Sequence, residues 1–338
     1  MSIKGIACSF MFFLIMILAA EASPNIIDLS YPPDNKIVEF GILGISLDVR
    51  KDSADLIKVT VNNERKATII PDSEFECFSV KLANGINRIT VLAIRKDRIV
   101  DLIHFKVFNR SDLETAYKVP PEGFRKDYFH MTEHSRCASC HVLEPDDFDK
   151  RSMNVTTFSM KVLASKTATA STCYPCHKDI TAFATVHGPA SVWNCLRCHD
   201  PYAALRYSVK KPVSEVCYRC HVEQENDWTA KKYIHGPVNS GKCTICHNPH
   251  ASDNRFMLFK PIWDLCVGCH VDAGSGKHIF TGINERGHPT RGKPDPLRKG
   301  KELACSSCHN PHASSSQKLW QLNVDNPYDL CKKCHIGH

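Results

Sequence analysis

Eight pentapeptides of the form Cys-x-x-Cys-His lie between Cys137 and His335. Two thiols and one imidazole at this spacing are the signature of covalent haem attachment. The sulfurs form thioether bonds to the porphyrin, and the histidine binds the iron as its proximal ligand. The attachment cysteines are Cys137, Cys140, Cys173, Cys176, Cys195, Cys198, Cys217, Cys220, Cys243, Cys246, Cys266, Cys269, Cys305, Cys308, Cys331 and Cys334. The proximal histidines are His141, His177, His199, His221, His247, His270, His309 and His335. The sequence therefore predicts eight c-type haems.

Zinc and disulfides are the other common uses of paired cysteines. Structural zinc needs four ligands per metal and does not require a histidine directly after each pair. A disulfide framework has no reason to repeat one pentapeptide eight times. Of the 18 cysteines, 16 belong to the motifs, which leaves Cys8 and Cys77. We expect Cys77 to be a small buried apolar residue, with an intermolecular thiol bridge as the alternative.

The remaining histidines indicate the sixth ligand of each iron. Ten of the 18 histidines lie outside the motifs, whereas only four methionines follow the N-terminal apolar segment. This ratio favours two imidazoles per iron, a ligand set without the thioether that raises the potential of His/Met haems. We set aside His104 as a structural histidine on an apolar strand. The expected distal ligands are His130, His134, His187, His235, His250, His278, His288 and His312, with His338 as a ninth candidate.

The motif-bearing stretch consists of repeated units that hold two motifs each. A histidine next to glycine and proline precedes the first motif of three units, in His187-Gly188-Pro189, His235-Gly236-Pro237 and Gly287-His288-Pro289. Another recurrent tripeptide follows that motif, as Asp200-Pro201-Tyr202, Asn248-Pro249-His250 and Asn310-Pro311-His312. The motifs at Cys137 and Cys173 form a more diverged first unit. Tyr202 replaces the histidine of its sister units, so one iron is bound by tyrosine, takes its ligand from elsewhere, or has none. His134, His278 and His338 are the candidates to fill this gap.

On these doubled motifs, residues 130–338 resemble the multihaem c-type cytochromes with doubled CXXCH motifs that are common in bacteria that respire on metals. Because residues 130–338 contain few long amphipathic patterns, we expect an octahaem region of short helices and irregular chain wrapped around its haems. The family resemblance supports His187, His235, His288, His250 and His312 as distal ligands. We expect the haem faces to supply the apolar core, so that this region stays unfolded without haem.

Residues 24–110 contain no haem motif and show apolar residues at every second position. Val59 and Val61, like Ile89 and Val91, are typical of half-buried strands, and Asn62-Asn63 is typical of a turn. Six or seven such strands predict an antiparallel β-sandwich. The segments Tyr31-Pro32-Pro33-Asp34-Asn35, Lys58-Val59-Thr60-Val61-Asn62-Asn63 and Leu82-Ala83-Asn84-Gly85-Ile86-Asn87-Arg88-Ile89-Thr90-Val91 resemble bacterial immunoglobulin-like domains. That resemblance implies a fold and no activity.

The N-terminus predicts export. An apolar run from Ile6 to Leu18, followed by Ala20-Glu21-Ala22, has the layout of a secretory signal peptide over residues 1–22. A retained N-terminal anchor is the alternative. No later segment reaches membrane-spanning length. Residues 111–129, with Pro120-Pro121, are expected to form a linker between the sandwich and the haem region.

The charge balance argues against a nucleic-acid partner. The formal net charge is +7, but a ferric haem with ionised propionates carries about −1, so eight haems bring the total to about −1. Clusters such as residues 206–211 and 291–301 are expected to pair with propionates or face solvent, with a docking patch for an acidic partner as the alternative.

These features predict an electron carrier of anaerobic respiration or extracellular electron transfer. We expect a location in the periplasm, at the outer membrane or outside the cell. The expected partners are donor and acceptor cytochromes, with docking to an outer-membrane porin-cytochrome conduit or self-assembly as further options. One alternative is a multihaem reductase of nitrite, hydroxylamine or a sulfur oxyanion with one open haem. The other is a surface or filament-forming structural cytochrome.

Overall fold

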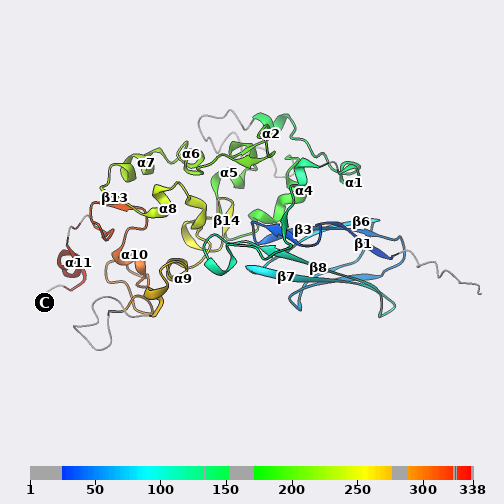
Figure 1. Cartoon of the computed structure of the whole chain (residues 1–338), viewed down its shortest axis with the longest axis horizontal. Coiled ribbons are helices and arrows are strands. Elements are labelled where there is room, and N and C mark those ends of the chain that lie inside the picture. The colour runs from blue at the N-terminus through cyan, green and yellow to red at the C-terminus, as the bar shows by residue number, and fades with distance from the viewer. Residues whose placement is uncertain are drawn as a thin grey trace, which may run out of the picture.

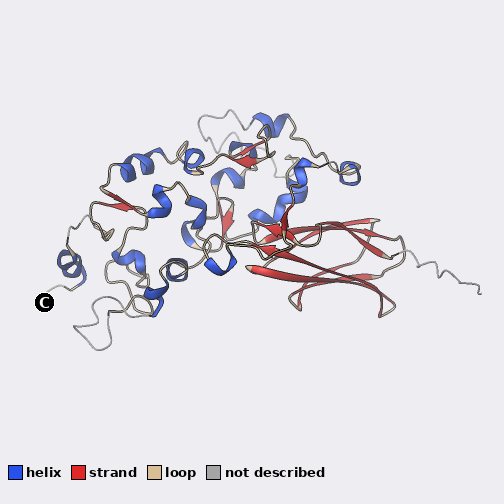
Figure 2. Cartoon of the chain, in the orientation of Figure 1, coloured by secondary structure: helices blue, strands red, loops and turns tan. Residues whose placement is uncertain are grey.

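The computed structural model describes residues 25–132, 134–151, 171–275, 288–322, 324 and 326–335. A sandwich of long strands is followed by a region of short helices and irregular chain, and together they form an elongated molecule (Figures 1 and 2). The predicted signal peptide and the candidate ligands His278 and His338 lie outside the described residues.

Two sheets form the predicted β-sandwich. The strands are β1 (Ile27–Tyr31), β2 (Lys36–Val38), β3 (Ile42–Val49), β4 (Leu56–Val61), β5 (Glu64–Ile69), β6 (Phe75–Lys81), β7 (Gly85–Arg95), β8 (Arg98–Asn109) and β9 (Arg125–Lys126). One sheet has the order β1-β3-β6 and the other has the order β5-β4-β7-β8-β2-β9. The sandwich is not wholly antiparallel as expected, because β2 pairs parallel with both β8 and β9.

The core of the sandwich follows the alternation seen in the sequence. Val59 and Val91 are fully buried on neighbouring strands β4 and β7, where they face each other across the ladder. Fifteen buried apolar side chains form one cluster between the sheets, and removal of their apolar surface from water stabilises the fold. Asn62 and Asn63 both have positive φ, 51° and 68°, so they form the turn that joins β4 to β5.

Cys77 is exposed, which corrects the expectation of a buried thiol. On β6, Val80 points into the core. Because side chains alternate along a strand, Cys77 lies on the opposite, outer face. The same alternation places His104 on the outside of β8, where its Nδ1 is 2.9 Å from the Thr90 hydroxyl.

The segment predicted as a linker contacts both regions. Its strand β9 extends the larger sheet, and the Lys36 Nζ donates a hydrogen bond of 2.7 Å to Asp127. Leu113 packs with Leu258 and Leu265 of the haem-motif region. The Lys260 Nζ lies 2.5 Å from a carboxylate oxygen of Glu114. Together with an ion pair between Arg136 and Asp48, these contacts fix the sandwich against the second region.

The second region has short elements and little core of its own. Its helices are α1 (Ser135–Ala138), α2 (Asp147–Arg151), α4 (Tyr174–His177), α5 (Gly188–Ser191), α6 (Ser214–Cys217), α7 (Val222–Thr229), α8 (Gly236–Asn239), α9 (Ile262–Val267), α10 (Cys305–Cys308) and α11 (Pro327–Cys334). Two-residue strands pair as β10 (Thr185–Val186) with β14 (Ala251–Ser252), β11 (His199–Asp200) with β12 (Ser208–Val209), and β13 (Tyr233–Ile234) with β15 (Ala313–Ser314). Its described apolar cluster contains three buried residues, and one of them, Leu113, comes from the linker.

Candidate haem-binding site

Most of the Cys-x-x-Cys-His motifs are wound as a single helical turn. In seven of the eight, the histidine N–H donates to the carbonyl of the first cysteine, at 2.8 to 3.1 Å. A helical turn places residues three and four apart on one face. Both sulfurs and the imidazole of a motif therefore face the same side of the chain, as attachment to one porphyrin requires.

Six motif histidines face a second histidine at a nearly constant distance. Their ring centroids are 6.0 to 6.3 Å apart, and in five pairs the ring planes are within 29° of parallel. The pairs are His130 with His177, His187 with His221, His199 with His250, His235 with His270, His247 with His312, and His288 with His335. Each joins one motif histidine to one of the expected distal ligands.

This spacing fits an iron between the two rings. An imidazole nitrogen binds a transition metal at about 2 Å and lies about 1.1 Å from its ring centroid, which gives about 6.2 Å between two rings on opposite sides of one metal. Rings in direct stacking contact lie closer, as His134 and Phe129 do at 3.7 Å. The paired histidines therefore have the separation of axial ligands.

In three of the units, a backbone carbonyl orients the histidine of the first motif. The Nδ1 atoms of His199, His247 and His309 each lie 2.7 Å from a carbonyl oxygen eight or nine residues downstream. A hydrogen bond from Nδ1–H fixes the tautomer and leaves the Nε2 lone pair for a metal. The acceptors are the carbonyls of Tyr207, Phe256 and Lys318. Tyr207 and Phe256 have positive φ, which turns the chain back towards the imidazole.

Burial keeps several expected distal ligands uncharged. It lowers the pKa of His130, His250 and His312 to about 4, with a smaller contribution in each case from neighbouring histidines. These imidazoles are neutral at neutral pH, and a neutral imidazole is the form that binds metal.

Aromatic side chains pack against the same histidines. The Trp228 indole stacks on His312, with centroids 4.1 Å apart and planes 10° apart. The Tyr207 ring meets His130 edge-on at 4.6 Å. Phe40 of the sandwich lies 5.1 Å from His250. These contacts restrict the rotamers of the rings.

The cysteines place consecutive motifs side by side. First cysteines of neighbouring motifs interact through their side chains, in the pairs Cys173–Cys195, Cys217–Cys243 and Cys266–Cys305. Burial and, to a smaller extent, a neighbouring second cysteine raise the pKa of Cys198, Cys246 and Cys308; these neighbours are Cys220, Cys269 and Cys334. Burial raises the pKa of the Cys176 thiol, with smaller contributions from Cys77 and Cys137. The eight motifs thus follow one another in space in their sequence order.

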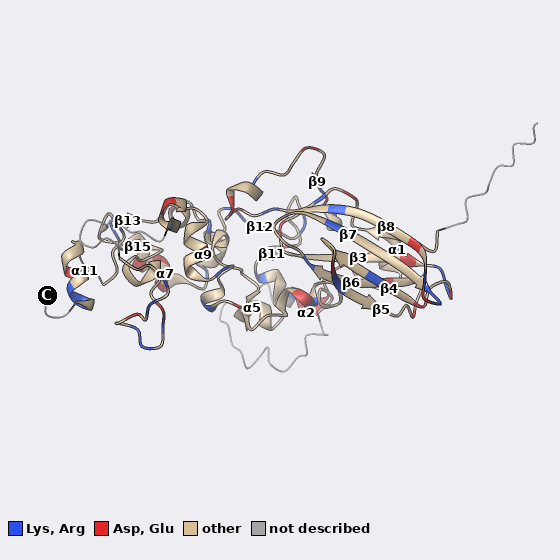
Figure 3. Cartoon of the chain, turned by 90° about the horizontal axis from the view of Figure 1, so that it is seen from below, with Lys and Arg blue, Asp and Glu red and all other residues tan. Residues whose placement is uncertain are grey.

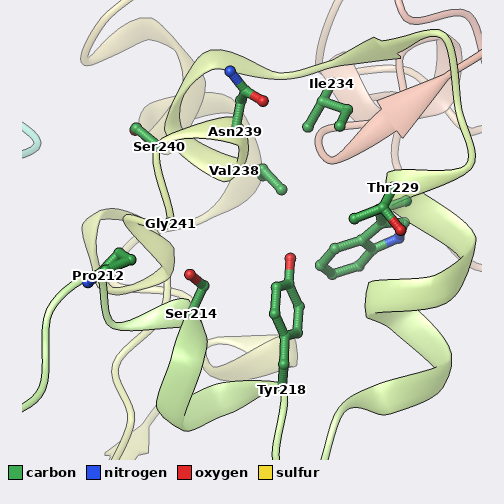
Figure 4. A pocket seen from close by; sticks show the side chains of 10 residues that line it. Pro212, Ser214, Tyr218, Thr229, Ile234, Val238, Asn239, Ser240 and Gly241 are labelled. Atoms are coloured by element: carbon green, nitrogen blue, oxygen red, sulfur yellow. The ribbon is translucent and has the colours of Figure 1, made fainter.

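A hollow of about 250 Å³ lies where two units meet. Figure 4 shows the Tyr218 hydroxyl and the Ser214 side chain directed into it, opposite Val238. Trp228, which stacks on His312, forms another wall. The hollow therefore adjoins the Cys217 motif and one of the paired histidines.

Other sequence-predicted site residues are placed differently. The Nε2 of His134 lies 2.8 Å from the Phe129 carbonyl oxygen and 2.8 Å from the Thr132 hydroxyl, so this ring faces its own backbone. His309 stacks on Trp320 at 4.7 Å. Within the described part of the chain, no histidine ring lies opposite His141 at the distance found in the six pairs.

Charges of both signs are interspersed over the described residues (Figure 3). In the basic clusters singled out from the sequence, Arg206 pairs with Glu144 at 2.6 Å and Arg298 with Asp295 at 2.7 Å.

Nowhere in the described ranges do three or more His, Cys, Asp or Glu side chains gather as the ligands of one metal ion.

Among the helices of the described residues, none has the length and apolar character that crossing a membrane requires.

A known family matches the repeated units. The family described as "Doubled CXXCH motif" matches residues 187–226, 235–275 and 295–338, which together make up less than half of the chain. These motifs indicate covalently bound c-type haem and support a multihaem cytochrome c involved in electron transfer. Proteins of this kind are generally electron carriers.

Solved structures match at low similarity. The fibronectin(III)-like modules of Clostridium thermocellum CbhA share 18% identity at a TM-score of 0.21, over 25% of this chain and 94% of that one. An FMN-binding beta-glucuronidase from Facaelibacterium prausnitzii L2-6 shares 12% identity at a TM-score of 0.22, over 29% of this chain and 14% of that one. An engineered protein shares 12% identity at a TM-score of 0.20, over 25% of this chain and 19% of that one. No curated protein matches the chain.

The sequence did not reveal the carbonyl acceptors or the packing aromatics. Tyr207 and Phe256 act through their backbone, so their residue type carries no signal. Trp228 had a weak signal, since a large aromatic residue in a short polar helix needs a partner to pack against.

Proposed function

We propose that this chain is an exported octahaem c-type cytochrome that transfers electrons along a row of bis-histidine haems. The six facing histidine pairs carry the proposal, because their common separation of 6.0 to 6.3 Å suits two axial ligands of one iron. Thioether bonds from each motif would hold the porphyrin edge, and one pair would hold each of six irons.

The residues of this chain do the positioning. A bound haem supplies a centre that gains and loses one electron. The carbonyl of Phe256 orients the His247 ring, and Trp228 holds His312 on the opposite side. The two neutral imidazoles of a pair would hold the iron from both sides, would leave no free position for a substrate, and would favour a low potential relative to His/Met ligation. Such a centre would pass electrons without binding reactants.

The order of the motifs favours a linear path. From the second motif onward, neighbouring motifs lie near one another alternately through their first cysteines and their second cysteines, so each haem would have one neighbour on either side. Repetition of the unit lengthens such a path without changing its chemistry. Donor and acceptor cytochromes would then meet the molecule at the ends of the row.

The cellular role that fits is anaerobic respiration or extracellular electron transfer. The signal-peptide pattern of residues 1–22 supports export to the periplasm, the outer membrane or the cell surface. The sandwich offers a surface for docking to a porin-cytochrome conduit or for self-assembly.

Haem counting tests the proposal. We expect a pyridine haemochrome assay and the intact mass of the purified protein to give eight haems per chain, with a low-spin spectrum from most centres. In the Cys305→Ser variant, we expect one haem fewer or degradation before isolation, whereas Cys77→Ser should keep all eight. A normal haem load in Cys305→Ser, or far fewer than eight in the parent protein, would contradict the proposal.

A further inference from the structure

The histidine pairs follow two recurrent patterns, one within a unit and one between consecutive units. The histidine ahead of a unit faces the second motif of the same unit, as His187 faces His221 and His235 faces His270. The histidine after a unit's first motif instead faces the first motif of the preceding unit. His250 thus faces His199, and His312 faces His247 in the same way.

The second pattern, between consecutive units, places Tyr202 opposite the first motif of the chain. Tyr202 follows the Cys195 motif, which opens the second unit. In the two sister units, the residue at this position faces the histidine of the first motif in the preceding unit. For Tyr202, the corresponding motif contains Cys137, Cys140 and His141.

Tyr202 is held in the same local turn as its histidine counterparts. The N–H of His250 donates to the Asn248 side chain at 3.0 Å, and that of His312 donates to Asn310 at 3.0 Å. The N–H of Tyr202 donates to the Asp200 carboxylate at 2.8 Å. An Asx turn of this kind fixes the direction of the residue two positions on. The backbone therefore presents Tyr202 as it presents the two histidines.

The neighbourhood of Tyr202 repeats in part: its segment lies beside the leading histidine of the preceding unit, but no backbone hydrogen bond from the His130 N–H to the Tyr202 carbonyl is found among the described residues. The N–H of His187 donates to the carbonyl of His250, and that of His235 donates to the carbonyl of His312, both at 2.8 Å. The corresponding histidine of the first unit is His130. The segment after Tyr202 lies beside it, because Tyr207 contacts the His130 ring and the Arg206 N–H donates to the Met131 sulfur at 3.4 Å.

From this equivalence we infer that the haem of the Cys137 motif is the place where the molecule binds a small neutral ligand, of the chemical class of carbon monoxide and nitric oxide. The inference rests on the proposed function, since it requires haem at this motif. Tyr202 takes the sixth position of this iron and holds it less firmly than a histidine would.

The chemistry of the side chain explains the difference. A phenol has an ordinary pKa of about 10 and is a poor metal ligand unless it loses its proton. Phenolate binds ferric haem iron, as tyrosine does in catalase. Reduction of the iron removes the positive charge that attracts the phenolate, which leaves the position open to a neutral ligand. Tyr202 is 76% exposed, so its ring has room to move aside, whereas His250 and His312 are partly buried.

Carbon monoxide titration of the dithionite-reduced holoprotein tests the inference. We expect the parent protein to bind carbon monoxide at once. Tyr202→His should lose one equivalent of this binding and convert one centre to a low-spin bis-histidine spectrum. Tyr202→Phe should keep that equivalent, because the phenyl ring cannot bind iron. The matched control is Ile70→His, since Ile70 is equally exposed at 76% and lies in the sandwich, outside the haem motifs and the repeated position.

Haem content separates the two proposals. Each variant is assayed for haem before the titration, and a shortage of haem in the parent protein counts against the octahaem proposal. With a full haem load, absence of carbon monoxide binding in the parent would overturn the inference. Equal binding by the parent and by Tyr202→His would overturn it too, as would loss of the equivalent in Tyr202→Phe.

Discussion

Individual histidines in this chain are positioned by contacts that sequence neighbours do not supply. The His199 ring is oriented by the Tyr207 carbonyl and faces His250, which belongs to the next unit. Phe40, from the sandwich, packs on the other member of this pair. Three parts of the chain therefore determine one proposed iron site.

Replacement of His250 by methionine should raise the potential of one haem. A thioether ligand stabilises ferrous iron relative to imidazole, and axial ligands tune haem potentials within a range of about 0.8 V. We expect a shift on the order of 0.1 V for one centre in a spectroelectrochemical titration, with the other seven almost unchanged. His104→Met, on the outer face of β8, is the control and should leave every potential unchanged.

The shifted haem should be the one attached at Cys195, although His250 follows the Cys243 motif in the sequence. Adding Cys195→Ala and Cys198→Ala to His250→Met should remove the shifted centre. If Cys243→Ala and Cys246→Ala remove it instead, the ligand comes from the motif that His250 follows. An unchanged titration would exclude His250 as a ligand.

At the level of elements, two kinds of structure differ in how far the sequence predicts them. Strands β4 and β7 were predictable, because alternation of Val59 with polar neighbours requires one buried face. Strand β9 was not, since a two-residue strand at Arg125–Lys126 shows no periodicity. The histidine candidates were identified by counting and repetition. Their partners could not be identified in this way, because the pairing of His312 with His247 depends on how one unit packs against another.

Without haem, only the sandwich should keep a stable structure. Helices of four to eight residues are unstable alone in water, and the described apolar cluster of the second region has only three buried members, against fifteen in the sandwich. The chain produced without haem attachment should show amide protection in β4 and β7 and exchange faster by orders of magnitude in α7 and α9. Hydrogen exchange of the haem-loaded protein is the control, with protection in both regions. Strong protection of α7 and α9 in the haem-free chain would mean that the polypeptide forms its own core there.

At the scale of the whole molecule, the sandwich lies next to the start of the row of motifs, and α11 lies far from it (Figure 1). Cys77 on β6 lies near enough to the first two motifs to add, after burial, to the raised pKa of the Cys137 and Cys176 thiols. Because Cys77 is exposed and carries a free thiol, a photosensitiser can be attached there. It would inject an electron at one end of the row.

Loss of a middle haem should interrupt electron transfer along the row, whereas loss of the first haem should not. His288→Met, opposite His335, would turn the last haem into an electron-accepting His/Met reporter whose sulfur-to-iron absorption band disappears on reduction. After a light flash on the Cys77-labelled protein, transient absorption should show electrons arriving at this reporter. Removal of the fourth haem by Cys217→Ala and Cys220→Ala should slow arrival by at least tenfold, because the third and fifth haems then have no intermediate between them. Removal of the first haem by Cys137→Ala and Cys140→Ala is the matched control and should change arrival little, because Cys77 also adjoins the second motif. Equal arrival times with and without the fourth haem would mean that the electrons follow a path that the linear order of the motifs does not provide.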